Sequence, residues 1–204
     1  MGFYSRFILP TIIDVVMNDK QVAEYRARVV PEAEGRVLEI GMGSGHNLPF
    51  YGDGVTSVVG LEPSAELMAM AEKRAAKTVL DVEFVGCPAE DMPFEDAGFD
   101  TVLTTWTLCS IGDYATALAE MRRVLKPAGR LIFVEHGLAP TPGVAAWQNR
   151  INPIWRPLAG GCNLNRPIDT MIAGAGFAIE GLETTYMKGP KPLSYTYLGR
   201  ARIA

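Results

Sequence analysis

The sequence is poor in the residues that build disulfide frameworks and metal sites. Its 204 residues include three cysteines and two histidines, and no two cysteines form a Cys-x-x-Cys pair. Without such a pair a structural zinc site is not expected. An odd number of scattered cysteines also fits a reducing compartment better than a disulfide-bonded secreted fold. We therefore predict a cytoplasmic protein that holds no metal.

The chain also lacks an excess of basic charge. It carries 19 Lys and Arg against 23 Asp and Glu, a formal net charge of −4, and no block of five or more like charges. General nucleic-acid binding needs a basic stripe, so we do not expect a nucleic acid as partner. The length and a hydrophobic fraction of 48% suit one α/β domain over residues 1–204 with a core of ordinary size.

No apolar run is long enough to span a bilayer. Residues 3–17 form an apolar start, but Arg6, Pro10 and Asp14 interrupt it. The segment also lacks the ordered basic region, apolar run and cleavage site of a signal peptide. Its apolar spacing favours a helix packed on the domain. Two alternatives stay open for it: a lid over the substrate pocket, and a peripheral contact with a membrane surface.

Apolar runs alternate with amphipathic stretches along most of the chain, which is typical of repeated strand–helix units. We expect a doubly wound, mostly parallel seven-stranded sheet with helices on both faces. Strands are predicted at residues 36–40, 57–61, 82–85, 101–105, 131–135, 178–186 and 195–203. One helix should run from a Ser64 cap towards Lys77, and another from an Asp113 cap through Tyr114 to Leu125.

The segment after the fifth predicted strand is rich in proline. Residues 137–167 contain five prolines, and we expect an irregular insert there, where such sheets build substrate pockets. A short helix should follow, with Asn165 as its cap and Pro167 in its first turn. The chain then divides into an N-terminal helical or lid segment (1–34), a cofactor-binding half (35–136), and the insert with the last strands (137–204).

The strongest chemical motif is a strand that runs directly into three glycines at alternate positions, Gly41, Gly43 and Gly45. Glycine tolerates a positive φ and has no Cβ to hold a ligand away from the backbone. About twenty residues later Glu62 ends the second strand, where a carboxylate can accept hydrogen bonds from ribose hydroxyls. The motif predicts a nucleoside site, and a glycine-rich turn without a ligand is the plainer alternative.

The spacing of this turn departs from the fingerprint of nicotinamide dinucleotide sites, Gly-x-Gly-x-x-Gly/Ala. His46 stands where that fingerprint needs its third small residue. Glu39 precedes the first glycine by two positions. A carboxylate there would repel a pyrophosphate and would suit a ligand that carries an ammonium and a sulfonium. A cationic nucleoside therefore fits this turn better than NAD.

Residues 39–45, Glu-Ile-Gly-Met-Gly-Ser-Gly, resemble motif I of the class I S-adenosylmethionine-dependent methyltransferases. Further matches run through about residues 36–136, and residues 89–94 resemble the family's adenine-contacting loop. Pro88 departs from the Asp or Asn that relatives often carry, which leaves adenine recognition to nearby backbone groups. The resemblance implies S-adenosylmethionine as cofactor and methyl transfer as reaction. It implies cofactor contacts from Glu39, Gly41, Gly43, Gly45, Asn47, Glu62, Pro63, Ala89, Glu90 and Thr105.

The second half resembles a narrower branch, the methyltransferase-like proteins that methylate small thiols. The string Gly-Cys-Asn-Leu-x-Arg at residues 161–166 carries most of this likeness, together with Thr-Leu-Cys-Ser-Ile at 107–111 and Glu135-His136. The resemblance implies a small thiol as methyl acceptor. Quinone and phospholipid methyltransferases share the first half and are the alternative, and a non-catalytic nucleotide-binding protein is a third hypothesis.

A thiol acceptor needs only modest help to ionise, because its pKa is about 8.5. His136 follows the fifth strand and is the candidate general base, although a structural hydrogen bond to residues 137–167 suits it equally. The Trp106 ring would face the sulfonium or pack in the core, since a cation favours an aromatic face. For Cys109 and Cys162, packing is the plainer role. Arg166 would grip an anionic acceptor or brace its loop. The pocket is predicted to be lined by Trp106, Cys109, Trp147, Trp155, Cys162 and Arg166.

Overall fold

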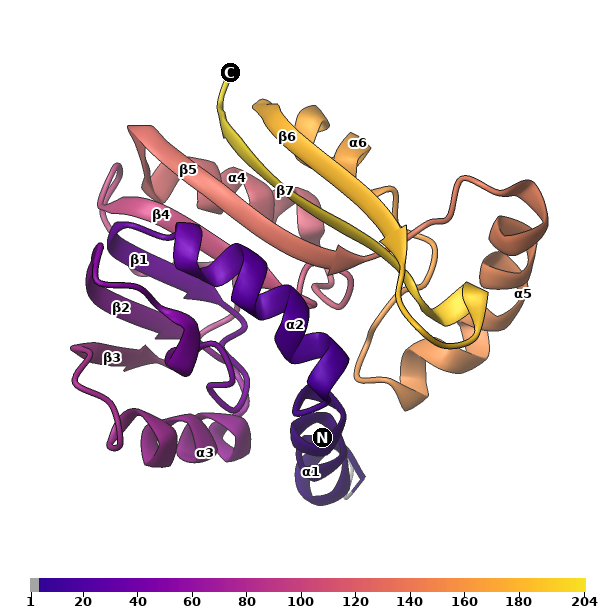
Figure 1. Cartoon of the computed structure of the whole chain (residues 1–204), viewed down its shortest axis with the longest axis horizontal. Coiled ribbons are helices and arrows are strands. Elements are labelled where there is room, and N and C mark those ends of the chain that lie inside the picture. Colours follow the sequence, from indigo (N-terminus) through magenta and orange to yellow (C-terminus); the bar gives the residue numbers. More distant parts are fainter. Residues whose placement is uncertain (1–3) are drawn as a thin grey trace.

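The computed structural model describes residues 4–204 and is organised around one seven-stranded sheet (Figure 1). The strands are β1 Gly35–Ile40, β2 Val55–Leu61, β3 Val82–Val85, β4 Phe99–Thr105, β5 Leu125–His136, β6 Phe177–Tyr186 and β7 Tyr195–Ile203. Their order is β3-β2-β1-β4-β5-β7-β6. Strands β1 to β5 pair in parallel, and β7 runs antiparallel to both β5 and β6. The predicted mostly parallel, seven-stranded sheet is confirmed.

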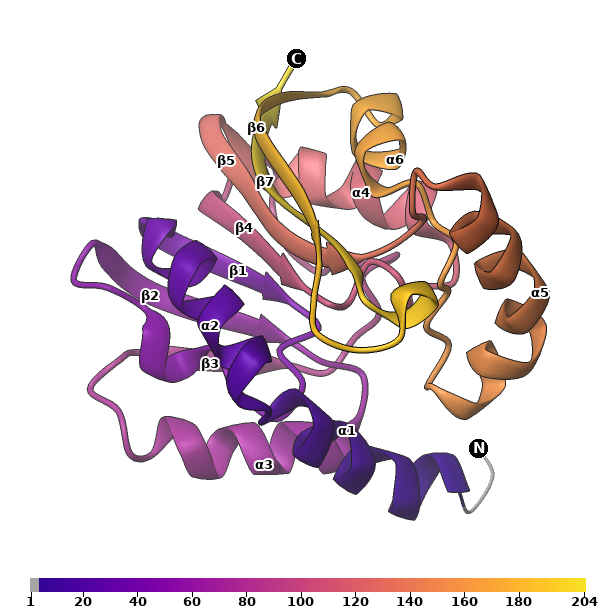
Figure 2. The same ribbon diagram turned by 45° about the vertical axis from the view of Figure 1, so that its right-hand side comes forward.

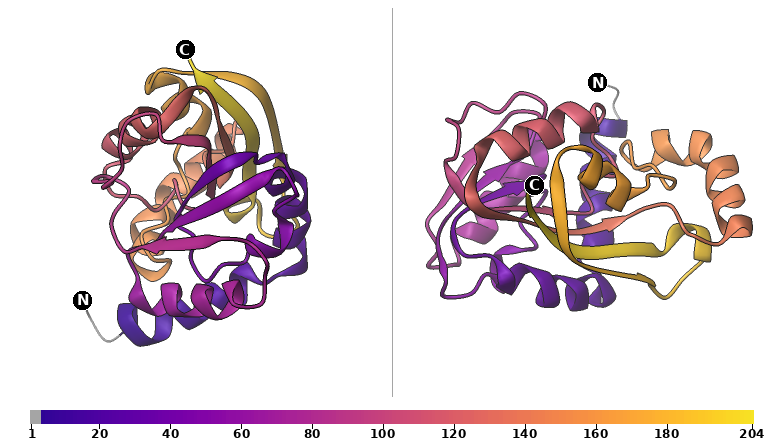
Figure 3. Two further views of the ribbon diagram at one scale, coloured as in Figure 1. Left: turned by 90° about the vertical axis from the view of Figure 1, so that its left-hand side faces the viewer. Right: turned by 90° about the horizontal axis from the view of Figure 1, so that it is seen from above.

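Helices cover both faces of this sheet (Figure 3). They are α1 Leu9–Met17, α2 Lys20–Val29, α3 Ala65–Ala75, α4 Tyr114–Val124, α5 Pro142–Leu158 and α6 Ile168–Gly174, with a π-helix at Tyr4–Ile8 before α1. Short 3-10 turns lie at Val30–Glu32, Leu48–Phe50 and Lys191–Leu193. One apolar core joins α4 and α6 to the sheet, and a second joins α2 and α3 to the opposite face. The chain is therefore doubly wound.

Two helices begin where their capping residues predict. The Ser64 side chain accepts a hydrogen bond from the backbone N–H of Leu67 at the start of α3. The Asp113 side chain does the same for Thr116 at the start of α4. Such caps satisfy backbone donors that the first helical turn leaves without partners.

The irregular insert predicted for residues 137–167 is wrong, because most of this segment forms the 17-residue helix α5. Pro142 occupies its first position, where a missing N–H costs no helical hydrogen bond. Pro153 and Pro157 lie inside the helix and each removes one such bond. Tertiary contacts offset that loss: the buried Gln148 side chain donates to the Gly137 carbonyl and accepts from the Ala139 N–H.

The predicted start of α6 is also wrong. Pro167 is itself the N-cap residue, and no side chain caps this helix. The Asn165 amide instead donates to Oδ1 of Asn149 at 2.8 Å, which joins its loop to α5. Burial of Ile168 and Ile172, both at 0% exposure, stabilises the short helix through packing where a cap is missing.

Helix α2 packs on one face of the sheet, and α1 continues beyond the carboxyl ends of β1 and β2, beside α3 (Figure 2). Asp14 of α1 pairs with Arg74 of α3 at 2.8 Å, and the Tyr4 hydroxyl donates to the Leu158 carbonyl at the end of α5 at 2.8 Å. The helix expected near the N-terminus is thus present from Leu9, whereas residue 3 lies outside the described residues. Within residues 4–204 no helix combines the length and the apolar character needed to cross a bilayer.

Candidate active site at the carboxyl edge of the sheet

The turn after β1 adopts left-handed backbone conformations at all three of its glycines, with φ values of 64° at Gly41, 59° at Gly43 and 83° at Gly45. A Cβ on Gly41 would lie 2.3 Å from a Thr107 side-chain carbon, and one on Gly45 would lie 3.1 Å from the Cα of Ala71. A Cβ on Gly43 would meet no atom closer than 3.9 Å. Packing therefore accounts for the outer two glycines, while Gly43 borders open space that a ligand could fill.

Glu62, at the end of β2, is buried beside this turn. One of its carboxylate oxygens accepts from the Gly43 N–H and the other from the Ser64 N–H, both at 2.9 Å. Burial raises its pKa, against these two hydrogen bonds. The carboxylate thus fixes the turn while remaining next to the space that Gly43 borders.

The remaining predicted cofactor residues on the β2–β3 side lie in loops at the same edge of the sheet. Pro63 is exposed and Ala89 is buried at 6% exposure in the apolar core. The Glu90 carboxylate accepts from the Asp113 N–H at 3.2 Å. These positions leave the adenine contact of Ala89 and Glu90 a prediction.

A buried polar cluster is formed around Glu39 in β1. Its two oxygens accept from Nδ2 of Asn47 at 2.8 Å and from the Tyr51 hydroxyl at 2.6 Å. Asn47 Nδ2 also donates to Oγ1 of Thr105 at 3.0 Å. Burial raises the pKa of Glu39 to about 7, although both hydrogen bonds and the charge of Arg26 favour its ionised form. Three predicted cofactor residues, Glu39, Asn47 and Thr105, are therefore joined in one network.

Arg26 of α2 completes this network, and no sequence motif predicts it. Its Nε donates to Oδ1 of Asn47 at 2.9 Å, and its Nη1 donates to the Met17 carbonyl at 2.7 Å. Arg26 is buried, with 4% of its surface exposed. Burial lowers its pKa to about 10. Its guanidinium lies 5.1 Å from the centre of the Trp106 ring. Tyr51, six positions after Gly45, was also missed as a site residue. For Arg26 the sequence carries no signal of a role in the site.

The loop after β4 is held by the buried carboxylate of Glu135. One oxygen accepts from the Thr104 hydroxyl at 2.7 Å and from the backbone N–H groups of Thr107 and Leu108, both at 3.0 Å. The other accepts from the Cys109 N–H at 3.3 Å. Burial raises the pKa of Glu135 to about 7, against these hydrogen bonds. The loop starts at Trp106, whose φ of 51° is rare for a side chain of that size.

The predicted acceptor residues divide into two groups. His136, Cys109, Cys162 and Trp155 meet beside this loop: Nδ1 of His136 lies 3.7 Å from Sγ of Cys162, and Cys109 and Trp155 lie beside the same sulfur. These neighbours lower the pKa of Cys162 to about 5, Cys109 most, despite burial. Among residues 4–204, Nε2 of His136 and the indole Nε1 of Trp155 are buried nitrogens without a hydrogen-bond partner.

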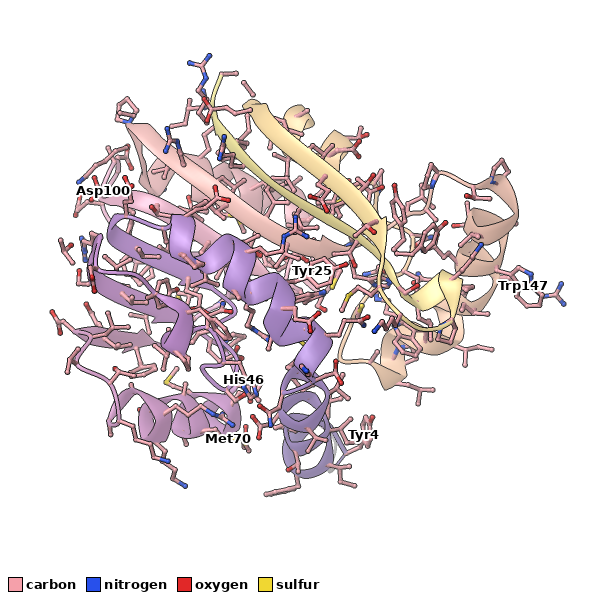
Figure 4. All side chains as sticks on the ribbon, viewed as in Figure 1. Tyr4, Tyr25, His46, Met70, Asp100 and Trp147 are labelled. Atoms are coloured by element: carbon pink, nitrogen blue, oxygen red, sulfur yellow. The ribbon has the colours of Figure 1, made fainter. Side chains whose placement is uncertain are left out.

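Three predicted pocket residues lie outside this cluster, and Trp106, beside Arg26, is one of them. Trp147 is 58% exposed and its ring points outward from α5 (Figure 4). Arg166 donates to the Leu108 carbonyl at 2.5 Å, and its guanidinium lies 5.1 Å from the Tyr114 ring centre. In this structure Arg166 braces the loop after β4.

A seven-stranded sheet in this order, with a glycine turn between two buried carboxylates, defines a class I methyltransferase fold. The family model described as "Methyltransferase domain" matches residues 38–133. Over 173 residues the chain is 35% identical to the human thiol S-methyltransferase TMT1B, covering 82% of this chain and 69% of that protein. The chain belongs to the S-adenosylmethionine-dependent methyltransferases, and S-adenosylmethionine is its cofactor.

Two further comparisons indicate how far this likeness extends. A demethylmenaquinone methyltransferase of Clavibacter sepedonicus is 34% identical over 62% of this chain and 52% of its own length. A solved S-adenosylmethionine-dependent methyltransferase from Thermotoga maritima has a TM-score of 0.69 at 20% identity, over 98% of each chain. The chain therefore spans between half and about two thirds of the length of these curated relatives.

The residues at the edge of the sheet fit this cofactor. The space beside Gly43 would be filled by any side chain at that position, and the buried carboxylates of Glu39 and Glu62 lie on either side of the turn. A cationic nucleoside with hydroxyl groups matches such a set of acceptors. In the part of the chain that the structure describes, no three His, Cys, Asp or Glu side chains are grouped as a metal ion would need.

The raised pKa of Glu39 predicts that cofactor binding releases a proton. With a pKa of about 7, much of this carboxyl is protonated in the free protein at pH 6 to 7. A bound cation favours the carboxylate, so binding lowers this pKa and weakens as the pH falls. We expect affinity to drop about tenfold from pH 8 to pH 6 relative to a Glu39→Gln variant, since the free-protein pKa lies between them.

Titration calorimetry in two buffers of different ionisation enthalpy measures the released proton directly. The Glu39→Gln side chain keeps the size of the original and cannot titrate, so it should bind without this proton release. Equal proton release by the variant would assign the titration to another group.

Proposed function

We propose that this chain transfers the methyl group of S-adenosylmethionine to a small thiol. The observation that carries the proposal is the set of side chains around His136. The sulfur atoms of Cys109 and Cys162 and the Trp155 ring form a polarisable, weakly polar surface, and Nε2 of His136 has no protein partner. Such a surface suits an uncharged thiol better than a large polar acceptor. The human relative is named as a thiol S-methyltransferase, which agrees with this choice.

The cofactor end of the site would be supplied by the turn after β1 and its neighbours. Gly43 and Glu62 would hold the ribose, and the Glu39–Asn47–Thr105 network would face the amino-acid part. S-adenosylmethionine supplies a methyl group on a positively charged sulfonium, which needs no further activation. The protein then has to hold both reactants in line and exclude water.

His136 would act as the base for the acceptor thiol. The lowered pKa of Cys162 favours the thiolate form of its sulfur. A thiolate accepts a hydrogen bond from Nδ1–H of His136, 3.7 Å away, and this selects the tautomer whose Nε2 carries a lone pair. Nε2 can then take the proton of a thiol with a pKa of about 8.5. Cys162 thereby orients the base, as a carboxylate orients histidine in hydrolytic triads.

Helix α1 would serve as the lid of this site. Asp14 accepts from Nε2 of His46 at 2.9 Å and from Arg74 at 2.8 Å, so it connects α1 to the residue directly after the glycine turn and to α3. Tyr4 connects the other end of this segment to α5. Opening of α1, as access by a cofactor requires, would break these polar contacts and the hydrogen bond from Arg26 to the Met17 carbonyl, and would expose the buried Leu9.

A second candidate function is methyl transfer to a membrane-borne quinone or phospholipid head group. The apolar side chains of Phe7, Val15 and Val16 are 55%, 68% and 58% exposed, and they would contact a membrane surface if residues 3–17 bind one. The similarity to a demethylmenaquinone methyltransferase agrees with this alternative.

A panel of acceptors distinguishes the two functions. The chain is given cofactor with a labelled methyl group together with hydrogen sulfide, an alkyl thiol, a demethylated quinone or phosphatidylethanolamine. We expect label on the thiols. His136→Gln should lower kcat at neutral pH by about a hundredfold, the usual share of a general base, with cofactor affinity unchanged. Label on the quinone or lipid alone would reject the thiol proposal.

A further inference from the structure

Two of the three cysteines of this chain lie against each other although 53 residues separate them. Asn163 joins their segments: its backbone N–H and its Nδ2 both donate to the Cys109 carbonyl, at 2.9 Å and 3.0 Å. The sulfur of Cys109 lies 3.6 Å from the Trp106 carbonyl oxygen and 3.5 Å from the Ser110 hydroxyl, and it interacts electrostatically with the sulfur of Cys162. Both are free thiols, as is Cys87, which lies elsewhere after β3. The two segments thus hold a dithiol at the edge of the sheet.

The two thiols differ in access and in ionisation. Cys109 is 2% exposed, whereas Cys162 is partly exposed. Cys109, with His136 and Trp155 alongside, lowers the pKa of Cys162 to about 5. The same pairing and burial raise the pKa of Cys109 well above its usual range. Cys162 is therefore the less buried and the more readily ionised of the two thiols, and Cys109 is the buried, protonated one.

Cys162 lies in a loop that is entered through two glycines. Gly160 and Gly161 precede it with φ values of 63° and 92°, and Asn163 follows it in a loop without regular structure. A short loop entered through two glycines can shift its Cβ by small changes of φ and ψ. An attacking cysteine followed by a buried resolving cysteine is the arrangement that thiol–disulfide exchange requires.

We propose that Cys162 and Cys109 form a reactive dithiol that reduces small disulfides at the mouth of the acceptor pocket. The Cys162 thiolate attacks one sulfur of a small disulfide RSSR, forming a Cys162–S–SR bond and expelling RS⁻. The Cys109 sulfur then attacks Sγ of Cys162, gives its proton to His136 or to the departing thiolate, and expels the second RS⁻. The protein is left as the Cys109–Cys162 disulfide, two electrons more oxidised, and an external dithiol must reduce it again.

This exchange would generate the proposed methyl acceptor, a small thiol, beside His136. The choice of small disulfides as substrate depends on the proposed thiol acceptor, because each exchange step releases a thiolate beside His136. The oxidised pair would also remove the Cys162 thiolate that orients His136. When the acceptor thiol is present mainly as its disulfide, the exchange would keep Cys109 and Cys162 oxidised. Methyl transfer would then be slow until the dithiol is reduced again.

The test uses the whole reduced chain without S-adenosylmethionine and with 2-hydroxyethyl disulfide as probe. We expect two molecules of 2-mercaptoethanol released per chain, and a cross-link between Cys109 and Cys162 in a peptide map. Cys109→Ser should stop at a mixed disulfide on Cys162, seen as a mass gain of one 2-mercaptoethanol unit. Cys162→Ser should release none, and Cys87→Ser, which changes a thiol whose pKa burial raises, should behave as the unmodified chain.

The pH dependence of the exchange separates a positioned thiolate from a merely accessible thiol. An ordinary cysteine loses about tenfold in thiolate with each pH unit below 8, because its pKa is about 8.5. With the pKa of Cys162 at about 5, the rate should stay level from pH 8 to pH 6. A rate that falls tenfold per unit, a mixed disulfide on Cys87, or no cross-link in the unmodified chain would each overturn the proposal.

The two proposals can fail independently. Disulfide exchange is read from protein mass and released thiol with no cofactor present, whereas methyl transfer is read from labelled product with a reduced thiol. A chain that methylates thiols and forms no cross-link rejects the dithiol alone. A chain that forms the cross-link and methylates no thiol rejects the proposed acceptor alone.

Discussion

Replacement of Gly43 by valine is expected to abolish binding of S-adenosylhomocysteine while the sheet stays folded. The Cβ of residue 43 would project into the space beside the turn, where the nearest protein atom is 3.9 Å away. The valine side chain would therefore occupy the space in which we expect the cofactor to bind. We expect affinity to fall at least about a hundredfold, which corresponds to roughly 2.7 kcal/mol. The left-handed φ of 59° adds a strain of about 1–2 kcal/mol, which a domain of this size tolerates.

Calorimetry with S-adenosylhomocysteine measures the affinity, and thermal unfolding followed by circular dichroism measures the fold. Gly143→Val is the matched control, because this glycine is exposed in the first turn of α5, a Cβ there would have no atom within 4 Å, and the residue has no part in the site. Unchanged affinity in Gly43→Val would place the nucleoside elsewhere. If Gly43→Val is unfolded, the same affinity is measured on Gly43→Ala, which adds one carbon to the same space.

Replacement of Glu135 by alanine should destabilise the chain more than any other single change considered for the site. Its carboxylate is the acceptor for the N–H groups of Thr107, Leu108 and Cys109. Loss of the carboxylate leaves buried backbone donors without partners, each at a cost of about 1–3 kcal/mol. Several kcal/mol are then lost, and because Tm shifts by about 2–4 °C per kcal/mol at this size, Tm should fall by at least about 6 °C.

The same loop carries Cys109 and contacts Arg166, so methyl transfer should also be lost in Glu135→Ala at temperatures where the chain is folded. Glu183→Ala is the matched control: this glutamate forms an exposed ion pair with Arg28, and such pairs contribute less than about 1 kcal/mol. Equal Tm values for the two variants would show that water replaces the lost carboxylate, and would contradict the role assigned to Glu135.

Local patterns were sufficient where the determining contacts are close in sequence. The strands, the caps at Ser64 and Asp113 and the glycine turn were all predicted, because each depends on alternation, capping or φ within a few residues. Helix α5 was not, because Pro153 and Pro157 are unfavourable locally and are tolerated only through tertiary contacts such as those of Gln148.

The sequence by itself determined the seven strands, the nucleoside turn and the methyltransferase family, but not helix α5. Only the tertiary structure brought Arg26 into contact with Asn47 and seated Cys162 between His136 and Cys109. The physical reason is the range of the forces: periodicity and backbone conformation act over a few neighbouring residues. Burial and the pKa of a thiol depend on groups that chain folding alone brings together from distant segments.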